Sequence, residues 1–86
     1  MAKKVIKFYA NWCGPCKAYT PVFDRVKNST DEVEFIEVNI DNDDAGLAAE
    51  MKVRSIPHTT LVLEDGSTKQ FSGIMSETQL REFIDG

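Results

Sequence analysis

Residues 11–16 have the sequence Asn-Trp-Cys-Gly-Pro-Cys and contain both cysteines of the 86-residue chain, Cys13 and Cys16. They directly follow an apolar run, residues 5–10, whose β-branched and aromatic side chains are typical of a strand. A Gly-Pro pair suits the first turn of a helix, where the missing N–H of proline would have no partner anyway. Two cysteines at this spacing on a first helical turn can close a disulfide. The stretch therefore predicts a strand, a dithiol able to store two electrons, and a helix.

The segment after the dithiol has helical and then strand character. Apolar side chains recur at intervals of three and four over residues 16–26, which indicates one buried helix face, and Pro21 predicts a kink within it. Residues 33–40 are rich in β-branched and aromatic side chains and predict a second strand. The acids and amides of residues 41–44 supply N-cap candidates for a short helix that continues to about Lys52.

The C-terminal third of the chain predicts a hairpin and a final helix. Two strand-like runs, residues 59–63 and 68–72, flank an Asp-Gly pair at 65–66, which is a strong signal for antiparallel pairing. Residues 76–79, Ser-Glu-Thr-Gln, form a capping-box pattern that starts a helix. We therefore expect residues 1–86 to form a single α/β domain of order βαβαββα, with a four-stranded mixed sheet flanked by three helices.

Composition narrows the class of protein. A net charge of −4 with scattered basic residues argues against nucleic-acid and acidic-membrane partners, which require clustered Lys and Arg. The N-terminal stretch is too short and too polar for a signal peptide or a spanning helix. We expect a cytoplasmic monomer. In that reducing compartment, two neighbouring cysteines are catalytic or metal-binding more often than structural.

The order of the two cysteines predicts their roles. Cys13 lies at the helix N-terminus, where free N–H groups and the helix dipole stabilise its thiolate. Cys16 lies deeper and suits a resolving thiol, which attacks only after a mixed disulfide has formed. The indole ring of Trp12 offers a flat apolar surface beside the Cys13 sulfur. We expect that sulfur to be exposed. Gly14 and Pro15 start the helix and stiffen the dithiol.

The sequence from Trp12 to Cys16, followed by Lys17 and by Pro21 in the same helix, resembles the thioredoxin family. Further matches lie at residues 39–41, which resemble the end of the family's next strand, and at residues 55–57, which resemble its cis-proline loop. Gly73 resembles the glycine that closes the family's substrate groove. A lowered pKa of the first cysteine is a known family property that comes with the resemblance and is not deduced from the spacing.

The resemblance implies a disulfide reductase that works in electron transport and cell redox homeostasis. Cys13 would attack, Cys16 would resolve, and their disulfide would be the only redox group, with no bound cofactor. The Ile56–Pro57 bond would be cis. Partners would be disulfide-containing proteins and a thioredoxin-reductase-like flavoenzyme as electron donor. The residues implied to border the substrate are Trp12, Ile56, Pro57, Gly73 and Ile74.

Two departures from the family stand out. Thioredoxins usually begin with an additional strand and helix, which we expect this shorter chain to lack. The family also has a buried Asp and a neighbouring Lys where this chain has Lys7 and Glu37, so the two charges are exchanged. Either the two side chains form a pair behind the dithiol, or both point to solvent. We hypothesise that Glu37, or Lys7 in its neutral form, takes the proton from Cys16.

Metal binding is not predicted. A zinc site needs about four ligands, and the two cysteines with the single histidine, His58, supply at most three. Residues 41–52 fail as a calcium loop because Ala45 and Lys52 stand where oxygen donors belong. We expect His58 to be solvated at the start of its strand.

Two alternative functions remain. A glutaredoxin-like, glutathione-dependent reductase fits the small size, although the Gly-Gly-acid pattern of that family is absent and the Ile74-Met75 pair suits a protein surface better. A redox-independent structural subunit of a larger complex would use a contact patch of Trp12, Ile56, Ile74 and Met75.

Overall fold

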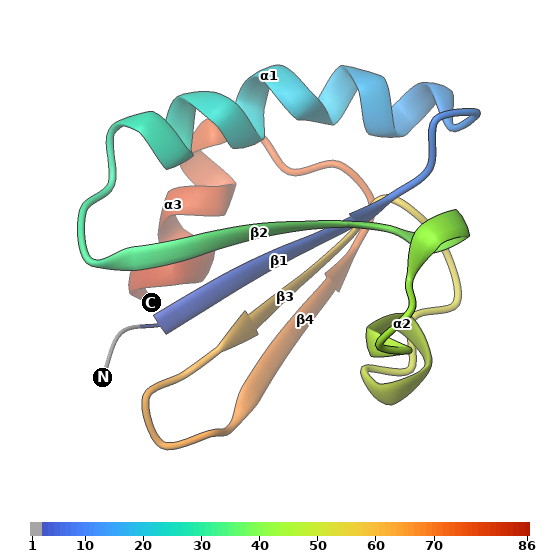
Figure 1. Cartoon of the computed structure of the whole chain (residues 1–86). Coiled ribbons are helices and arrows are strands. Elements are labelled where there is room, and N and C mark those ends of the chain that lie inside the picture. Colours follow the sequence, from blue (N-terminus) through green and yellow to red (C-terminus); the bar gives the residue numbers. More distant parts are fainter. Residues whose placement is uncertain (1–2) are drawn as a thin grey trace.

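The computed structural model describes residues 3–86. Its element order confirms the predicted βαβαββα arrangement (Figure 1). The elements are β1 (Lys3–Tyr9), α1 (Gly14–Asn28), β2 (Val33–Asn39), the short 3-10 helix η1 (Ile40–Asn42), α2 (Leu47–Glu50), β3 (His58–Val62), β4 (Thr68–Ser72) and α3 (Glu77–Asp85).

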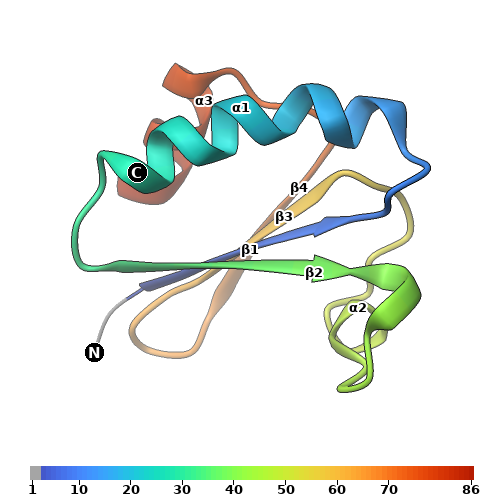
Figure 2. The same cartoon turned by 45° about the horizontal axis from the view of Figure 1, so that its top comes forward.

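The four strands form one mixed sheet in the order β2-β1-β3-β4 (Figures 1 and 2). β1 pairs in parallel with β2 and antiparallel with β3, and the β3–β4 pair is an antiparallel hairpin. Phe8 near the end of β1 pairs with His58 at the start of β3. The dithiol that follows β1 and the Ile56–Pro57 loop that precedes β3 are therefore brought to the same end of the sheet.

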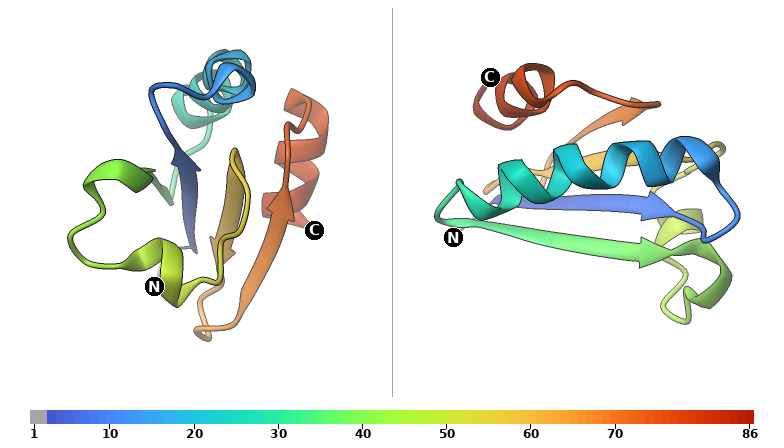
Figure 3. Two further views of the ribbon diagram at one scale, coloured as in Figure 1. Left: turned by 90° about the vertical axis from the view of Figure 1, so that its right-hand side faces the viewer. Right: turned by 90° about the horizontal axis from the view of Figure 1, so that it is seen from above.

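α1 and α3 cover one face of the sheet, and the short α2 lies on the opposite side near the end that carries the dithiol (Figure 3). The main core fills the space beneath α1 and α3, since apolar side chains from both helices and from the central strands meet there. Its fully buried members are Val5, Tyr19, Phe23, Val26, Leu61, Met75, Leu80 and Ile84.

α1 forms because its buried residues recur on one face at helical spacing and its N-terminus is capped. Cys13 is the N-cap, and Pro15 lies in the first turn, where no N–H is required. The buried positions Cys16, Tyr19 and Phe23 follow at intervals of three and four. The helix continues through Pro21 as one element.

The helix expected between residues 41 and 52 is shorter than predicted. Only Leu47–Glu50 is α-helical, and residues 40–42 form η1 instead. The Asp43 carboxylate accepts hydrogen bonds from the N–H groups of Leu47 and Ala48 (3.0 and 2.8 Å), which delays the start of the helix. Gly46 precedes that start with a φ of 70°, outside the helical region.

The final helix begins as predicted. The Ser76 hydroxyl accepts from the Gln79 N–H at 3.1 Å, and the Gln79 side chain accepts from the Ser76 N–H at 2.8 Å, so the capping box is complete. Within residues 3–86, no helix has the length and apolar character needed to cross a membrane.

Candidate active site

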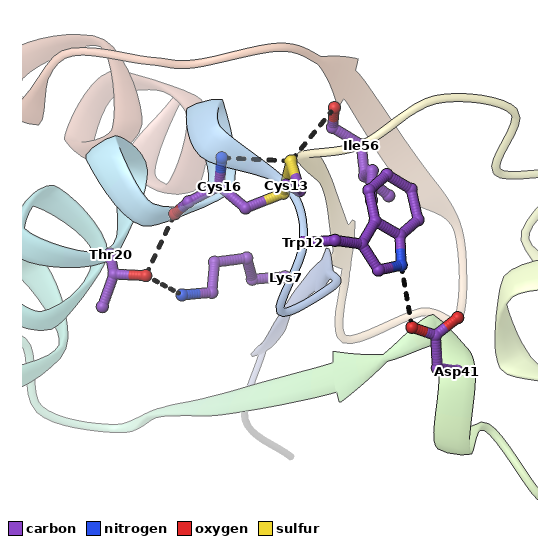
Figure 4. The surroundings of a disulfide bond; sticks show 7 residues. All are labelled: Lys7, Trp12, Cys13, Cys16, Thr20, Asp41 and Ile56. Atoms are coloured by element: carbon purple, nitrogen blue, oxygen red, sulfur yellow. Dashed lines mark hydrogen bonds between the residues drawn. A yellow bond between two sulfur atoms is a disulfide. The ribbon is translucent and has the colours of Figure 1, made fainter.

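The two cysteines form a disulfide at the N-terminus of α1, with their Cα atoms 5.3 Å apart (Figure 4). The Sγ atom of Cys13 accepts a hydrogen bond of 3.2 Å from the Cys16 N–H. A backbone donor and the positive end of a 15-residue helix thus both face this sulfur, and both favour negative charge on it. The expectation of an exposed Cys13 is wrong for the disulfide form, because the residue is buried among Ala10, Cys16 and Ile56.

Trp12 lies beside the disulfide with 68% of its surface exposed. Its indole Nε1 donates a hydrogen bond of 2.9 Å to Oδ2 of Asp41, the middle residue of η1 (Figure 4). The bond holds a large apolar ring at the surface. A hollow of about 380 Å³ next to this ring is lined by Trp12, Ile40, Ala48, Val53, Arg54, Ser55 and Ile56.

The loop before β3 passes directly over the dithiol. The Ile56–Pro57 bond is cis, as the family resemblance implied. The backbone oxygen of Ile56 lies 3.9 Å from Cys13 Sγ, and the oxygen of Pro57 accepts a hydrogen bond of 2.9 Å from the Gly73 N–H. Gly73 has a φ of 106°, which favours glycine. The structure therefore brings Cys13, Ile56, Pro57 and Gly73 together.

The residues after Gly73 differ in exposure. Ile74 is exposed beside the loop. Met75 is fully buried in the main core, so its expected place in a surface contact patch is wrong. After Gly73 the chain turns toward α3. The Met75 side chain is therefore directed inward, between the sheet and that helix.

Lys7 and Glu37 form an ion pair behind the disulfide, which settles the choice between a pair and two solvated side chains. The two residues are direct neighbours in the parallel β1–β2 register, and Nζ lies 2.8 Å from Oε1. The Lys7 side chain is 1% exposed and that of Glu37 is 37% exposed. Lys7 Nζ also donates to Oγ1 of Thr20 at 3.1 Å, and that hydroxyl donates to the Cys16 carbonyl at 3.0 Å (Figure 4).

The family model for thioredoxin matches residues 1–86. This chain belongs to the thioredoxin family. It is 35% identical over 83 residues to a thioredoxin of Mycoplasmoides gallisepticum, covering 95% of this chain and 81% of that protein. It is 37% identical over 87 residues to a thioredoxin of Mycoplasma genitalium, covering 98% of this chain and 83% of that protein.

A solved thioredoxin structure agrees with these relatives. The X-ray structure of Fasciola hepatica thioredoxin matches with a TM-score of 0.85 and 35% identity, over 98% of this chain and 79% of that chain. Thioredoxins are protein disulfide oxidoreductases, and the Cys13–Cys16 pair has the two-residue spacing of their redox centre. The chain is therefore a thiol-disulfide oxidoreductase.

Sequence reasoning gave His58 the wrong environment within this thioredoxin fold. The residue is only 6% exposed, because it packs edge-on against the Phe8 ring and lies opposite Ser72 of β4. Its Nδ1 is 3.3 Å from Ser72 Oγ, and its Nε2 is 2.7 Å from Gln70 Oε1. The His58 ring is therefore buried by residues of the neighbouring strands. These residues are distant in sequence, so the residues next to His58 did not indicate its burial.

Three other residues of the site were given no site role from the sequence. Asp41 holds Trp12, Thr20 joins Lys7 to Cys16, and Ile40 packs against the dithiol cluster. The position of Thr20 four residues after Cys16 was a usable signal, because such residues share a helix face. Across residues 3–86, no cluster of three or more His, Cys, Asp or Glu side chains could hold a metal ion.

Proposed function

We propose that this thioredoxin reduces protein disulfides with Cys13 as the nucleophile and Cys16 as the resolving cysteine. The observation that most supports these roles is the environment of Cys13 Sγ. It accepts the Cys16 N–H at the helix N-terminus and lies 3.9 Å from the backbone of the Ile56 loop. One sulfur thus combines a donor that stabilises its thiolate with a neighbouring backbone able to hold a substrate.

The reaction has two exchange steps. The Cys13 thiolate attacks one sulfur of the substrate disulfide, that S–S bond breaks, and the other substrate sulfur leaves as a thiolate that takes a proton. Cys16 then loses its proton and attacks Cys13 Sγ, which releases the second substrate thiolate. Two electrons pass to the substrate, and the chain is left with the Cys13–Cys16 disulfide. No bound cofactor takes part in this scheme.

The substrate segment would lie extended between the Trp12 ring and the loop of Ile56 and Pro57. Backbone pairing along Ile56 gives affinity without side-chain specificity, as in strand addition at a sheet edge. The exposed rings and side chains of Trp12 and Ile74 add apolar contact. Gly73 borders the groove and ties its two loops together through the Pro57 oxygen.

Proton release from Cys16 is assigned to the Lys7–Glu37 pair. The contacts from Glu37 through Lys7 and Thr20 reach the Cys16 carbonyl, so the pair is linked to the turn that carries the resolving thiol. Glu37 is the better acceptor of the two, because its partly exposed carboxylate can pass a proton to water, whereas the Lys7 side chain is buried.

The reduced form would be regenerated by a thioredoxin-reductase-like flavoenzyme in the cytoplasm, with this protein acting as a monomer in electron transport and cell redox homeostasis. Family membership supports this donor, since thioredoxins in general receive electrons from thioredoxin reductase. The scattered charge and the exposed Trp12 and Ile74 side chains favour disulfide-containing proteins as substrates.

Insulin disulfide reduction tests the function. We expect turnover with NADPH and thioredoxin reductase and little turnover with glutathione as the only donor. Cys16→Ser should trap a mixed disulfide with the substrate, and Cys13→Ser should not. Absence of reduction with either donor would contradict the proposal, and retention of biological activity by the double Cys→Ser variant would favour a structural subunit.

A further inference from the structure

Thr20 occupies a position between the charge pair and the dithiol. It lies one turn after Cys16 on α1 and is half-buried. Its hydroxyl donates to the Cys16 carbonyl at 3.0 Å and accepts from Lys7 Nζ at 3.1 Å, so donor and acceptor capacity are both used (Figure 4). In the proposed reaction this hydroxyl only links Lys7 to the Cys16 turn and has no further role.

The Lys7 ammonium depends on a small set of partners for its position. Glu37 Oε1 is 2.8 Å away on the β2 side, and the rings of Tyr9 and Phe23 lie 5.4 and 5.0 Å from Nζ. Within residues 3–86, Thr20 is the residue that hydrogen-bonds this ammonium to α1. Because Lys7 is 1% exposed, water cannot easily replace a lost partner.

We propose that Thr20 is a positioning residue for the resolving step: its hydroxyl holds the Lys7 ammonium against the turn that carries Cys16, where the positive charge stabilises the Cys16 thiolate. Without that acceptor, the ammonium is drawn toward the half-exposed Glu37 and away from the helix. The inference rests on the proposed role of Cys16 as the resolving cysteine.

The link from Lys7 to the Cys16 carbonyl passes through the Thr20 side chain. The Cys16 carbonyl is the acceptor of a helical hydrogen bond, and the Thr20 hydroxyl adds a second donor to it. The hydroxyl thereby joins a buried charge on β1 to the first turns of α1. An aliphatic side chain of the same size would keep the packing of Thr20 and remove both contacts.

Titration of Cys16 without its partner cysteine isolates this effect. The other titratable groups near the turn are Lys17 of α1, Lys7 and Tyr9 of β1, Glu37 of β2 and the neighbouring Cys13. In a Cys13→Ser background Cys16 is the sole thiol, and the rate of its alkylation by iodoacetamide against pH reports its thiolate fraction.

We expect Thr20→Val to raise the midpoint pH of this alkylation by about one unit, because it displaces a nearby positive charge. Thr20→Ser keeps the hydroxyl and should restore the original midpoint. In the two-cysteine protein, release of a mixed disulfide at pH 7 should be about three- to tenfold slower with Thr20→Val, because a roughly tenfold smaller thiolate fraction is partly offset by the greater nucleophilicity of the more basic thiolate.

An unchanged midpoint in Thr20→Val, or an equal shift in Thr20→Ser, would overturn the proposal. Circular dichroism establishes whether each variant is folded. If Thr20→Val does not fold, Thr20→Ala takes its place, since alanine is the strongest helix former. Failure of the proposed function is distinguishable, because insulin reduction and substrate trapping are measured with Thr20 in place.

Discussion

The indole Nε1 of Trp12 donates a hydrogen bond of 2.9 Å to Oδ2 of Asp41, which lies 29 residues further along the chain. Asp41 is itself fixed, because its N–H donates to the side chain of Asn39 at 2.9 Å. The end of β2 thereby sets the orientation of a ring that is 68% exposed beside the disulfide. An exposed apolar side chain with a fixed orientation loses less conformational entropy when a substrate binds.

Replacement of Asp41 by alanine should weaken substrate binding. Without this bond the Trp12 ring must be ordered when substrate binds, which costs about 0.5–1.5 kcal/mol, so we expect KM for insulin to rise about two- to tenfold with kcat little changed. Asp44→Ala is the matched control, since it removes an exposed acid of the same segment, whereas the hydrogen bond of Trp12 goes to Asp41. Equal effects of the two substitutions would show that charge, and not the orientation of Trp12, is responsible.

Removing one member of the Lys7–Glu37 pair should cost more stability than removing both. Glu37→Gln leaves a buried ammonium without its counter-charge, and we expect the free energy of unfolding to fall by about 1–3 kcal/mol, less than for a fully buried pair because Glu37 is partly exposed. Lys7→Met with Glu37→Gln should recover part of that loss. Urea denaturation of the two single variants and the double variant measures the coupling, and strict additivity would contradict it.

The contact of His58 with Gln70 should contribute to stability. Gln70→Leu leaves the buried Nε2 without its 2.7 Å partner, and we expect a loss of about 1 kcal/mol, or a Tm lower by about 4–8 °C for a domain of this size. Gln70→Glu keeps an acceptor oxygen at the same position and serves as the control. A Tm in Gln70→Leu equal to that of the original protein would contradict the prediction.

Burial of Tyr19 should make the fold sensitive to alkaline pH. Burial raises the pKa of its phenol above the usual 10.0, and the 2.8 Å hydrogen bond with Thr59 partly opposes that rise. The folded state therefore keeps the proton that the unfolded chain loses, so the stabilisation is complete below pH 10 and is lost as the pH rises through the folded value.

Denaturation curves from pH 8 to 11 test this expectation. The free energy of unfolding of the original protein should fall above pH 10, and that of Tyr19→Phe should fall less steeply. Thr59→Val removes the same hydrogen bond but keeps the ionisable phenol, so its decline above pH 10 should persist. Parallel curves for the original protein and Tyr19→Phe would rule out the contribution of Tyr19.

Much of the fold follows from local signals in the sequence. The spacing of Cys16, Tyr19 and Phe23, the capping box at Ser76 and the Asp-Gly turn each involve residues within a few positions of one another, and all three elements formed as predicted. Local preference also misled at residues 41–46, since the Asp43 carboxylate accepts the free N–H groups of Leu47 and Ala48 and the α-helix starts only at Leu47.

The site was only partly predictable, because some of its contacts join segments that are distant in sequence. The dithiol and its helix are contiguous in sequence, whereas the Trp12–Asp41 bond and the burial of His58 depend on strand register. The hydrophobic character of Met75 indicated a surface contact, but its place immediately before the N-cap of α3 directs it into the core. Contacts between distant segments become visible only after the sheet order is known.

The hairpin turn lies at the opposite end of the sheet from the disulfide. β3 starts at His58 beside Phe8 and ends at Val62 beside Lys4, a span of about 13 Å along the strand. The turn at residues 64–67 is exposed, and Asp65 stabilises it through the Ser67 N–H and hydroxyl. A linker attached within this turn would anchor the protein to an electrode or resin. The Cys13–Cys16 disulfide would then face away from the support.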